Sequence, residues 1–264
     1  MTETIPSTLT TSHNGIGRIY FRNPDRRNAI TQAMWTDLAE AAKSFAVDAD
    51  IRVVIIRGEG ELAFSAGADI SEFDNNRRDP AQIKAYNETI QEAIEAIEAI
   101  PVPVVALVHS LCIGGGTAAA IACDLRYFAD DAQFGIPAVR LGVGYDPRWI
   151  KRLVDAVGST NASSVLLTGR RFSAQAALRI GLATEVYPKA DLDTLVEDIV
   201  LDIATNAPLS LRAAKKAIQE SLAFDKDRDW LTPFEMIETC AHSKDYLRAL
   251  DAFSEKEKAV FNGD

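Results

Sequence analysis

The apolar positions in the first half of the chain fall into two alternating patterns. Short apolar runs predict strands at residues 16–21, 53–56, 104–108 and 125–128. The continuous runs at 53–56 and 104–108 are typical of strands that are buried on both faces. Between these runs, apolar residues recur at every third or fourth position, as they do on one face of a helix. Strands that alternate with helices predict an α/β core.

Two of the helical patterns are long and well defined. The first begins near Gln32, and its apolar face is formed by Met34, Leu38, Ala41 and Phe45. The second stops at Pro101 and Pro103, because proline cannot continue a helix. Its apolar face is formed by Ile83, Tyr86, Ile90, Ile94 and Ile97.

Glycine and proline divide the rest of the chain. The cluster at residues 114–116 (GGG) opens an alanine-rich helix that runs to about Ala122, and from about Pro147 the chain reads as mostly helical. We therefore expect a core at residues 1–200 and a helical region at residues 201–264. The ending at residues 253–261 is amphipathic, which suits either docking on a partner subunit or a terminal helix capped by solvent.

Composition and charge exclude several classes of function. Of 264 residues, 47% are hydrophobic and 25% charged, which is ordinary for a globular protein. The formal net charge of −10 argues against a nucleic-acid partner and against an anionic membrane surface. No stretch has the form of a signal peptide, and no run approaches the roughly 18 apolar residues of a membrane helix. We therefore expect a cytoplasmic protein.

The cysteines and histidines do not predict a metal site. Cys112, Cys123 and Cys240 lack the spacing of metal ligands, and we interpret them as small buried hydrophobic residues in a reducing compartment. None of the three histidines has a second histidine three or four positions later. His109 is interpreted as a buried, hydrogen-bonded histidine rather than a base.

Two glycine-containing segments are the first candidates for chemistry. They are residues 63–70 (AFSAGADI) and residues 113–117 (IGGGT), and each lies between a predicted strand and a predicted helix. Glycine allows the backbone to approach a ligand closely, and N–H groups at a helix start point outward. Two such groups from two loops could hold a developing oxyanion. Neither segment is a P-loop or a dinucleotide-binding fingerprint, and a glycine cluster alone often serves only in a turn or in packing.

Together these segments resemble the signature segments of the enoyl-CoA hydratase/isomerase (crotonase) superfamily, and the resemblance covers nearly the whole chain. Residues 23–30 (NPDRRNAI) resemble the family's first CoA-contacting loop. Residues 123–125 (CDL) and 134–137 (FGIP) resemble the strand pair beside the active site. Residues 181–186 (GLATEV) and 253–261 match later landmarks of the family.

The resemblance implies a spiral of repeated ββα units, followed by a C-terminal helical trimerisation region in a homotrimer or a dimer of trimers. It implies an acyl-CoA thioester substrate, with no cofactor apart from the coenzyme A of the substrate, and an enolate held by two backbone N–H groups. By position, these donors are Ala68 and Gly115. The implied CoA contacts, of which the last two usually come from a neighbouring subunit, are Arg27, Ala29, Ala66, Ile70, Lys258 and Phe261.

The chain departs from the family at the two glutamates that hydratases use. Their positions hold Ala118 and Ala138. Adding water requires a group that activates the water and a source for the proton delivered to carbon, and alanine can do neither. We therefore expect isomerase, lyase or C–C bond chemistry. The alternatives are an acyl-CoA-binding pseudoenzyme, a slow enoyl-CoA hydratase, or a structural subunit.

Asp146 is the replacement candidate for acid/base work, within residues 141–149 (LGVGYDPRW). Some branches of the family carry an aspartate in this stretch. As a general base it would gain from partial burial, which raises a carboxyl pKa towards neutrality. The other interpretation is a helix cap, with Asp146 at the N-cap and Pro147 at the first helical position. Asp69 and Glu72 are interpreted in the same way, as groups that satisfy the first turn of the next helix.

Overall fold

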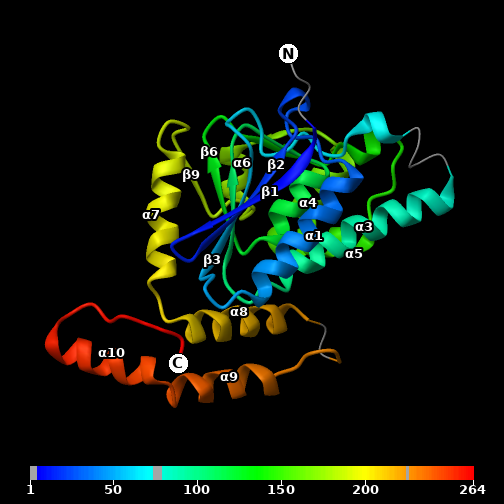
Figure 1. The fold of residues 1–264 in the computed structure, drawn as a ribbon. Helices are drawn as coiled ribbons and strands as arrows, with labels where there is room; N and C mark the ends of the chain where they lie inside the picture. The colour runs from blue at the N-terminus through cyan, green and yellow to red at the C-terminus, as the bar shows by residue number, and fades with distance from the viewer. Residues whose placement is uncertain (1–4, 74–78, 224–225) are drawn as a thin grey trace.

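The computed structural model describes residues 5–73, 79–223 and 226–264. It contains two sheets and a series of helices (Figure 1). The strands are β1 (Ser7–His13), β2 (Ile16–Arg22), β3 (Val53–Gly58), β4 (Val104–Val108), β5 (Leu111–Ile113), β6 (Leu125–Ala129), β7 (Gln133–Gly135), β8 (Phe172–Ser173) and β9 (Glu185–Tyr187). The helices are α1 (Gln32–Val47), α3 (Pro80–Glu98), α4 (Gly115–Ala122), α5 (Pro147–Thr168), α6 (Ala174–Arg179), α7 (Leu192–Ala204), α8 (Pro208–Leu222), α9 (Leu231–Ala241) and α10 (Lys244–Glu255).

The larger sheet has the order β1-β2-β3-β4-β6-β9, and all its pairs are parallel except the β1–β2 hairpin. The hairpin turns through Asn14 and Gly15, both at positive φ, as a two-residue turn between twisted strands requires. All residues of β4 and all but one of β3 are buried, because helices cover both faces of the sheet. Figure 1 shows α7 on one side of this sheet and α1, α3 and α4 on the other.

The smaller sheet lies on the path by which the chain forms a spiral of repeated turns. It has the order β5-β7-β8, and its first two strands are parallel. The chain passes from β4 to β5 and then to α4, and next from β6 to β7, so each turn contributes one strand to each sheet. This is the expected α/β fold of repeated ββα turns. The strand ends and the glycine-opened start of α4 are thereby brought to one edge of the molecule.

The predicted helices follow from local sequence. Thr31 caps α1 by accepting a hydrogen bond from the N–H of Met34, at 3.2 Å. Asp79 caps α3 in the same way through the N–H of Gln82, and Pro80 occupies the first helical position. Both helices bury their predicted apolar faces, with the exception of the partly exposed Ile83.

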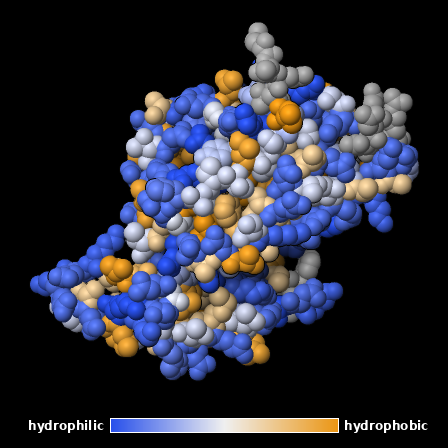
Figure 2. Space-filling view, viewed as in Figure 1, coloured by the Kyte–Doolittle hydropathy of each residue, from blue (hydrophilic) through white to orange (hydrophobic). Residues whose placement is uncertain are grey.

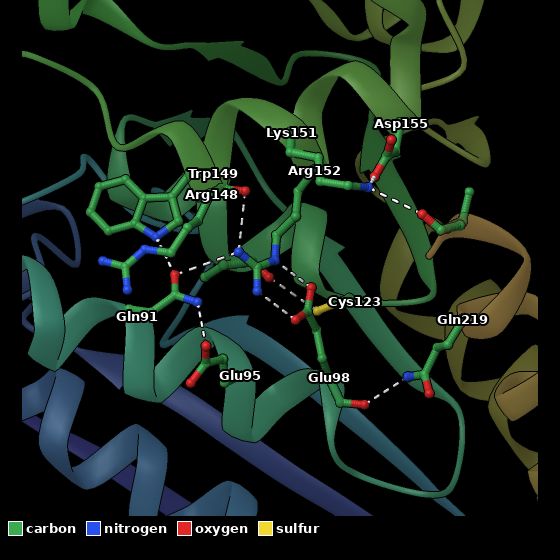
Figure 3. Close-up of polar contacts among 12 residues, drawn as sticks. Gln91, Glu95, Glu98, Cys123, Arg148, Trp149, Lys151, Arg152, Asp155 and Gln219 are labelled. Carbon is green, nitrogen blue, oxygen red and sulfur yellow. Dashed lines mark hydrogen bonds and ion pairs between the residues drawn. The ribbon is translucent and has the colours of Figure 1, made fainter. Parts of the chain in front are cut away.

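Helices α3, α5 and α8 are tied together by polar side chains as well as by apolar packing (Figure 3). The Arg152 guanidinium on α5 binds the Glu98 carboxylate at the end of α3, with 2.7 Å between Nη2 and Oε2. Gln219 on α8 donates to the backbone carbonyl of Glu98 at 2.8 Å. The helical layer is therefore anchored to the core where α3 ends.

The C-terminal region differs from the expectation in two details. The expected boundary at residues 200/201 falls inside α7, which packs against β2, β3 and β6 as a single helix, so the layer beyond the sheet begins at α8. The predicted helix at residues 253–261 is interrupted, because α10 ends at Glu255 and Lys256 takes a left-handed conformation. The chain then turns back, and the Asp245 carboxylate accepts hydrogen bonds from the N–H groups of Asn262 and Gly263.

Candidate active site

The two glycine-containing segments lie side by side. The N–H of Ser65 donates to the carbonyl of Leu111 at 2.9 Å, and the N–H of Ile113 donates to the carbonyl of Ser65 at 3.0 Å. Spatial proximity of two loops that are far apart in the sequence is what an oxyanion hole built from both requires. The structure therefore brings together the segments that the sequence singled out.

The backbone N–H groups of Ala68 and Gly115 are among those in these segments that have no protein acceptor within the described residues. The N–H of Gly67 donates to the Ser65 hydroxyl at 3.0 Å, and that of Gly114 donates to the carbonyl of Gly135 at 2.8 Å. The next N–H in each segment, that of Ala68 and that of Gly115, makes no such bond. Gly115 opens α4, so its N–H lies at the positive end of the helix dipole.

Glycine is needed here for steric reasons. Gly67 and Gly114 have φ of 101° and 54°, in the region that disfavours residues with a Cβ. A Cβ at Gly115 would lie 2.9 Å from Cζ2 of Trp35, and a Cβ at Gly116 would lie 2.7 Å from Cβ of Ser65. The glycine cluster thus allows the start of α4 to approach both α1 and the first segment.

A cavity of about 130 Å³ lies beside these N–H groups. Its wall is almost entirely apolar or backbone, and none of the described lining residues carries a carboxylate, an amine or an imidazole. The lining residues are Trp35, Ala66, Gly67, Ala68, Ile70, Phe73, Tyr86, Ile90, Ile113, Gly114, Gly115, Ile136, Pro137, Ala138, Leu141, Val143, Gly144, Tyr145 and Trp149.

The two alanines at the positions where the resemblance implies glutamates in hydratases, Ala118 and Ala138, lie differently. Ala138 lines the cavity, at the second position of a 3-10 turn (Pro137–Arg140). Ala118 is buried within α4 and is not part of the wall. Neither position supplies an acid or a base.

Asp146 lies at the N-cap of α5, next to the wall residue Tyr145. Its carboxylate accepts a hydrogen bond from the backbone N–H of Arg148 at 2.9 Å, so the predicted cap is present. The Arg148 guanidinium also binds it, and these hydrogen bonds hold the pKa of the Asp146 carboxyl below its ordinary value. The expected rise of this pKa towards neutrality is therefore wrong, because the sequence did not show that an arginine two positions later would pair with the carboxylate.

Asp69 and Glu72 have structural partners. Asp69 caps a short 3-10 turn through the N–H of Ser71 and pairs with Arg26 at 2.9 Å. Burial opposes its ionisation, but hydrogen bonds from Ser71 and the nearby Arg26 hold the pKa of Asp69 below its ordinary value. Glu72 accepts the N–H of Gln32 at the start of α1, at 2.8 Å.

His109 is buried away from the cavity wall. Its Nε2 lies 2.5 Å from the Asp193 carboxylate at the start of α7, on the side of the sheet that α7 covers. The interpretation as a buried, hydrogen-bonded histidine is confirmed for Nε2, whereas the buried Nδ1 has no partner among the described residues.

The expected CoA contacts divide into two groups. Ala66 and Ile70 line the cavity, and Arg27 is joined to the same segment because its carbonyl accepts the N–H of Ala66 at 3.0 Å. Ala29 is buried one residue before Ile30, which pairs with Ala68. Of these four residues, Arg27 and Ile70 are exposed, Ala66 is partly buried and Ala29 is buried.

The second group, Lys258 and Phe261, lies in the segment after α10. Lys258 is exposed, and neither residue lines the cavity. Asn262, the residue after Phe261, contacts the Arg52 guanidinium through its carbonyl, and Figure 1 shows the C-terminus beside α8 and α9. Within one chain this segment belongs to the helical layer.

Other expectations concern metals and membranes. No cluster of three potential metal ligands occurs among the described residues. None of the described helices is both long and apolar enough to cross a membrane. Cys112 and Cys123 are buried, and burial raises the pKa of the Cys112 thiol to about 12, which keeps it protonated.

Sequence reasoning missed several wall residues, of which Trp35 is the most unusual. Tyr86 and Ile90 were read as the core face of α3, and they line the cavity as well. Trp35 is fully buried on α1, and its indole Nε1 has no hydrogen-bond partner among the described residues. Periodicity marks such positions as buried but does not distinguish a core from a cavity wall.

Known proteins resemble this chain over nearly its full length. It is 31% identical to the crotonyl-CoA hydratase of Syntrophomonas wolfei over 243 residues, which cover 92% of this chain and 93% of that protein. It is 27% identical to the mitochondrial Δ(3,5)-Δ(2,4)-dienoyl-CoA isomerase of Rattus norvegicus, with 94% of this chain and 79% of that protein covered.

A solved structure and a family model agree with these relatives. The crystal structure of an enoyl-CoA hydratase/carnithine racemase from Magnetospirillum magneticum superposes with a TM-score of 0.94 at 32% identity, and covers 99% of this chain and 97% of that one. The family model described as enoyl-CoA hydratase/isomerase matches residues 11–264. This chain therefore belongs to the enoyl-CoA hydratase/isomerase family.

Proposed function

We propose that this protein is an acyl-CoA-processing enzyme that holds a thioester enolate between the backbone N–H groups of Ala68 and Gly115. The observation that carries the proposal is this pair of N–H groups, which lack a protein acceptor and lie beside an apolar cavity. A negatively charged oxygen is stabilised strongly by fixed donors in a site that excludes water. The same donors would bind the neutral thioester carbonyl more weakly, so they favour the enolate.

The reaction that suits this wall is isomerisation, a lyase reaction or C–C bond chemistry rather than ordinary hydration. Hydration needs one group that activates the water and a source for the proton delivered to carbon. At the positions where the family resemblance implies these glutamates, the chain has Ala118 and Ala138, which can do neither. Moving a proton between two carbons of an enolate needs only one group that accepts and then returns it. The wall itself offers no titratable carboxylate for this step.

Asp146 is the group that we propose for the proton transfer. It follows Tyr145, which lines the cavity, and like any ordinary aspartate it is ionised at neutral pH, a state that its lowered pKa favours further. To reach an acyl group its carboxylate must turn away from Arg148. Glu88 on α3 offers Arg148 a second carboxylate, with 3.1 Å between Nη1 and Oε2, so the arginine keeps a partner during that movement.

Two other functions remain as alternatives. A pseudoenzyme that binds acyl-CoA without turnover is favoured by the ion pair that holds Asp146, because that carboxylate is not free in this conformation. A slow enoyl-CoA hydratase is favoured by the match to a crotonyl-CoA hydratase.

Binding and turnover measurements separate these functions. Saturating butyryl-CoA should raise the melting temperature of the protein, since a ligand that binds only the folded state stabilises it. A panel of 3-enoyl and dienoyl thioesters should then be isomerised faster than crotonyl-CoA is hydrated, by at least about 10²-fold, because acid–base groups contribute on that scale. Hydration of crotonyl-CoA as fast as isomerisation would reject the proposal. Binding without turnover of any thioester would favour the pseudoenzyme.

A further inference from the structure

The two proposed oxyanion donors are held in different ways. The N–H of Gly115 belongs to the same trans peptide as the carbonyl of Gly114, and this carbonyl accepts the N–H of Ala118 at 3.1 Å within α4. Because the N–H and C=O of a planar trans peptide point in opposite directions, α4 itself fixes the direction of the Gly115 N–H. Ala68 lies outside the helices and strands, so other contacts must fix the direction of its N–H.

Those contacts come from segment 23–30, through the backbone of Ile30. The carbonyl of Gly67 belongs to the same peptide as the Ala68 N–H, and it accepts the N–H of Ile30 at 2.7 Å. On the other side of Ala68, the N–H of Asp69 donates to the carbonyl of Ile30 at 3.0 Å. Together these bonds form the bridge between Ile30 and Ala68. The Ala68 N–H therefore keeps its direction only while Ile30 and Asp69 keep their relative position.

The Asp69 side chain connects the same two segments a second time. Its Oδ1 accepts a hydrogen bond from Nη1 of Arg26 at 2.9 Å, and its Oδ2 lies 3.5 Å from Nδ2 of Asn23. Asn23 also donates to the backbone carbonyl of Ala29 at 2.8 Å. The Asp69 side chain is only 5% exposed. The carboxylate thus ties the residue that follows the proposed donor to segment 23–30.

Helix capping alone does not explain these contacts. Asp69 caps a turn of three residues, Ile70–Glu72, and its Oδ1 accepts the N–H and the hydroxyl of Ser71 at 3.0 and 2.7 Å. A neutral asparagine or serine could cap the same turn. Burying a carboxylate is costly unless the charge is paired, and here the pairing comes from Arg26, 43 positions earlier. The charge therefore serves the connection between the two segments.

We propose that Asp69 is a positioning residue, which aligns the Ala68 N–H with the developing oxyanion by its contacts with Arg26 and Asn23. This inference rests on the proposed function, because it requires Ala68 to be an oxyanion donor. Asp69 is not part of the cavity wall, so it acts through the backbone and not by touching the acyl group. Displacing a group at a reacting centre by about 1 Å can cost about 10²-fold in rate.

A thioester that forms a stable enolate tests this alignment directly. Acetoacetyl-CoA ionises to an enolate that differs from the neutral form in near-ultraviolet absorbance. The ratio of bound enolate to bound neutral ligand therefore reports how strongly the oxyanion hole stabilises the charge. In Asp69→Asn, which preserves the shape and the cap, this ratio at a fixed pH should fall about tenfold, since the donor is displaced and not removed. Binding of butyryl-CoA, which stays neutral, should change by less than about twofold.

Two further variants separate positioning from stability. Asp193→Asn is the matched control, because the Asp193 carboxylate also binds an arginine from a distant segment, Arg57, but lies on the side of the sheet that α7 covers. Its enolate ratio should equal that of the wild type, whatever its melting temperature. Arg26→Met removes the partner of Asp69 and leaves the cap, so it should lower the ratio in the same direction. Arg26 is 53% exposed, so this variant keeps the test valid if Asp69→Asn folds poorly.

The double variant and the wild type complete the test. The effects of Asp69→Asn and Arg26→Met on the enolate ratio should not add, because the two substitutions remove the same contact. A wild-type ratio in folded Asp69→Asn and Arg26→Met would overturn the inference, and so would an equal fall in Asp193→Asn. If the wild-type protein does not bind acetoacetyl-CoA, or if the bound ligand ionises no more readily than in free solution, the proposed function itself fails.

Discussion

The Asp146 carboxylate and the Arg148 guanidinium form a two-point contact at the start of α5. Nη2 of Arg148 lies 2.7 Å from Oδ2, and Nε lies 3.0 Å from Oδ1. The backbone N–H of Arg148 donates to the same carboxylate, which is therefore both a helix cap and half of an ion pair. Three hydrogen bonds from Arg148 stabilise the charged form of Asp146, which explains why its pKa lies below the ordinary value.

The first prediction concerns the pH dependence of this contact. The pKa of Asp146 is lowered in the folded state, so its contribution to stability is present above the unfolded value of about 3.9 and is lost as the pH falls through the folded value. Arg148→Met should reduce the free energy of unfolding at pH 7 by about 0.2–1 kcal/mol, since Arg148 is 41% exposed and the ion pair is screened.

Denaturant unfolding at pH 7 and at pH 3 checks this prediction. The difference between Arg148→Met and the wild type should shrink at pH 3, where Asp146 is largely protonated in the unfolded chain. In an Asp146→Asn background the same substitution should have a smaller and less pH-dependent effect, as a double-mutant cycle would show. An equal loss of stability at both pH values would mean that Arg148 acts through packing, because its other ion-pair partner, Glu88, is also a carboxylate.

The second prediction separates the cap from the proposed base. Asn is about as good an N-cap as Asp, so Asp146→Asn should lower stability only by the worth of this partly exposed ion pair, about 1 kcal/mol or less. Asparagine cannot accept the proton, so turnover of the true thioester should fall by at least about 10²-fold. The measurement is kcat at saturating substrate, with circular dichroism as the control for folding. Near-normal turnover would leave Asp146 as a cap and an ion-pair partner only.

The sequence predicted the helices and strands that are long enough to show a hydrophobic pattern within one segment. Helices α1 and α3 and the buried strands β3 and β4 have enough residues to show a period or a continuous apolar run. The strands β5, β7, β8 and β9 have two or three residues each, too few for any period, and the edge strand β1 is mostly polar. These strands exist because partner strands and turns from elsewhere in the chain hold them.

In the candidate site, too, some features can be predicted from one segment of the sequence, and others depend on contacts between distant segments. The segments that hold Ala68 and Gly115 could be found because glycine marks a backbone requirement. The surroundings of Asp146 could not, because its pKa depends on where the Arg148 side chain points. The sequence also could not predict that the N–H of Trp35 is unpaired, because a hydrogen-bond partner depends on the three-dimensional neighbours.

The third prediction concerns the Gly115 donor. Gly115 occupies the first position of α4, where proline is tolerated, so Gly115→Pro removes the N–H without breaking the helix. Any side chain at this position would also press on Trp35, so Gly115→Ala is the matched control that keeps the donor. Turnover of Gly115→Pro should be about 10²–10³-fold below that of Gly115→Ala. Equal turnover in two folded variants would show that Gly115 is not an oxyanion donor.

The fourth prediction concerns assembly. Figure 2 shows apolar side chains exposed on the layer formed by α8, α9 and α10. Those of α9 and α10 are Leu231, Phe234, Ile237, Leu247, Leu250 and Phe253, of which Phe253 is 85% exposed. Large apolar side chains that gather on one exposed layer mark an interaction site, and the expected partners are further copies of this chain.

Light scattering tests this assembly. The wild-type protein should have a mass close to three or six times 28.7 kDa at micromolar concentration. Phe253→Asp places a charge in the expected interface and should shift the protein to smaller species, because an unpaired buried charge is costly. Val47→Asp is the matched control, since Val47 at the end of α1 is also 85% exposed but lies outside this layer. The layer would not be the interface if the wild type were monomeric, or if the two variants dissociated equally.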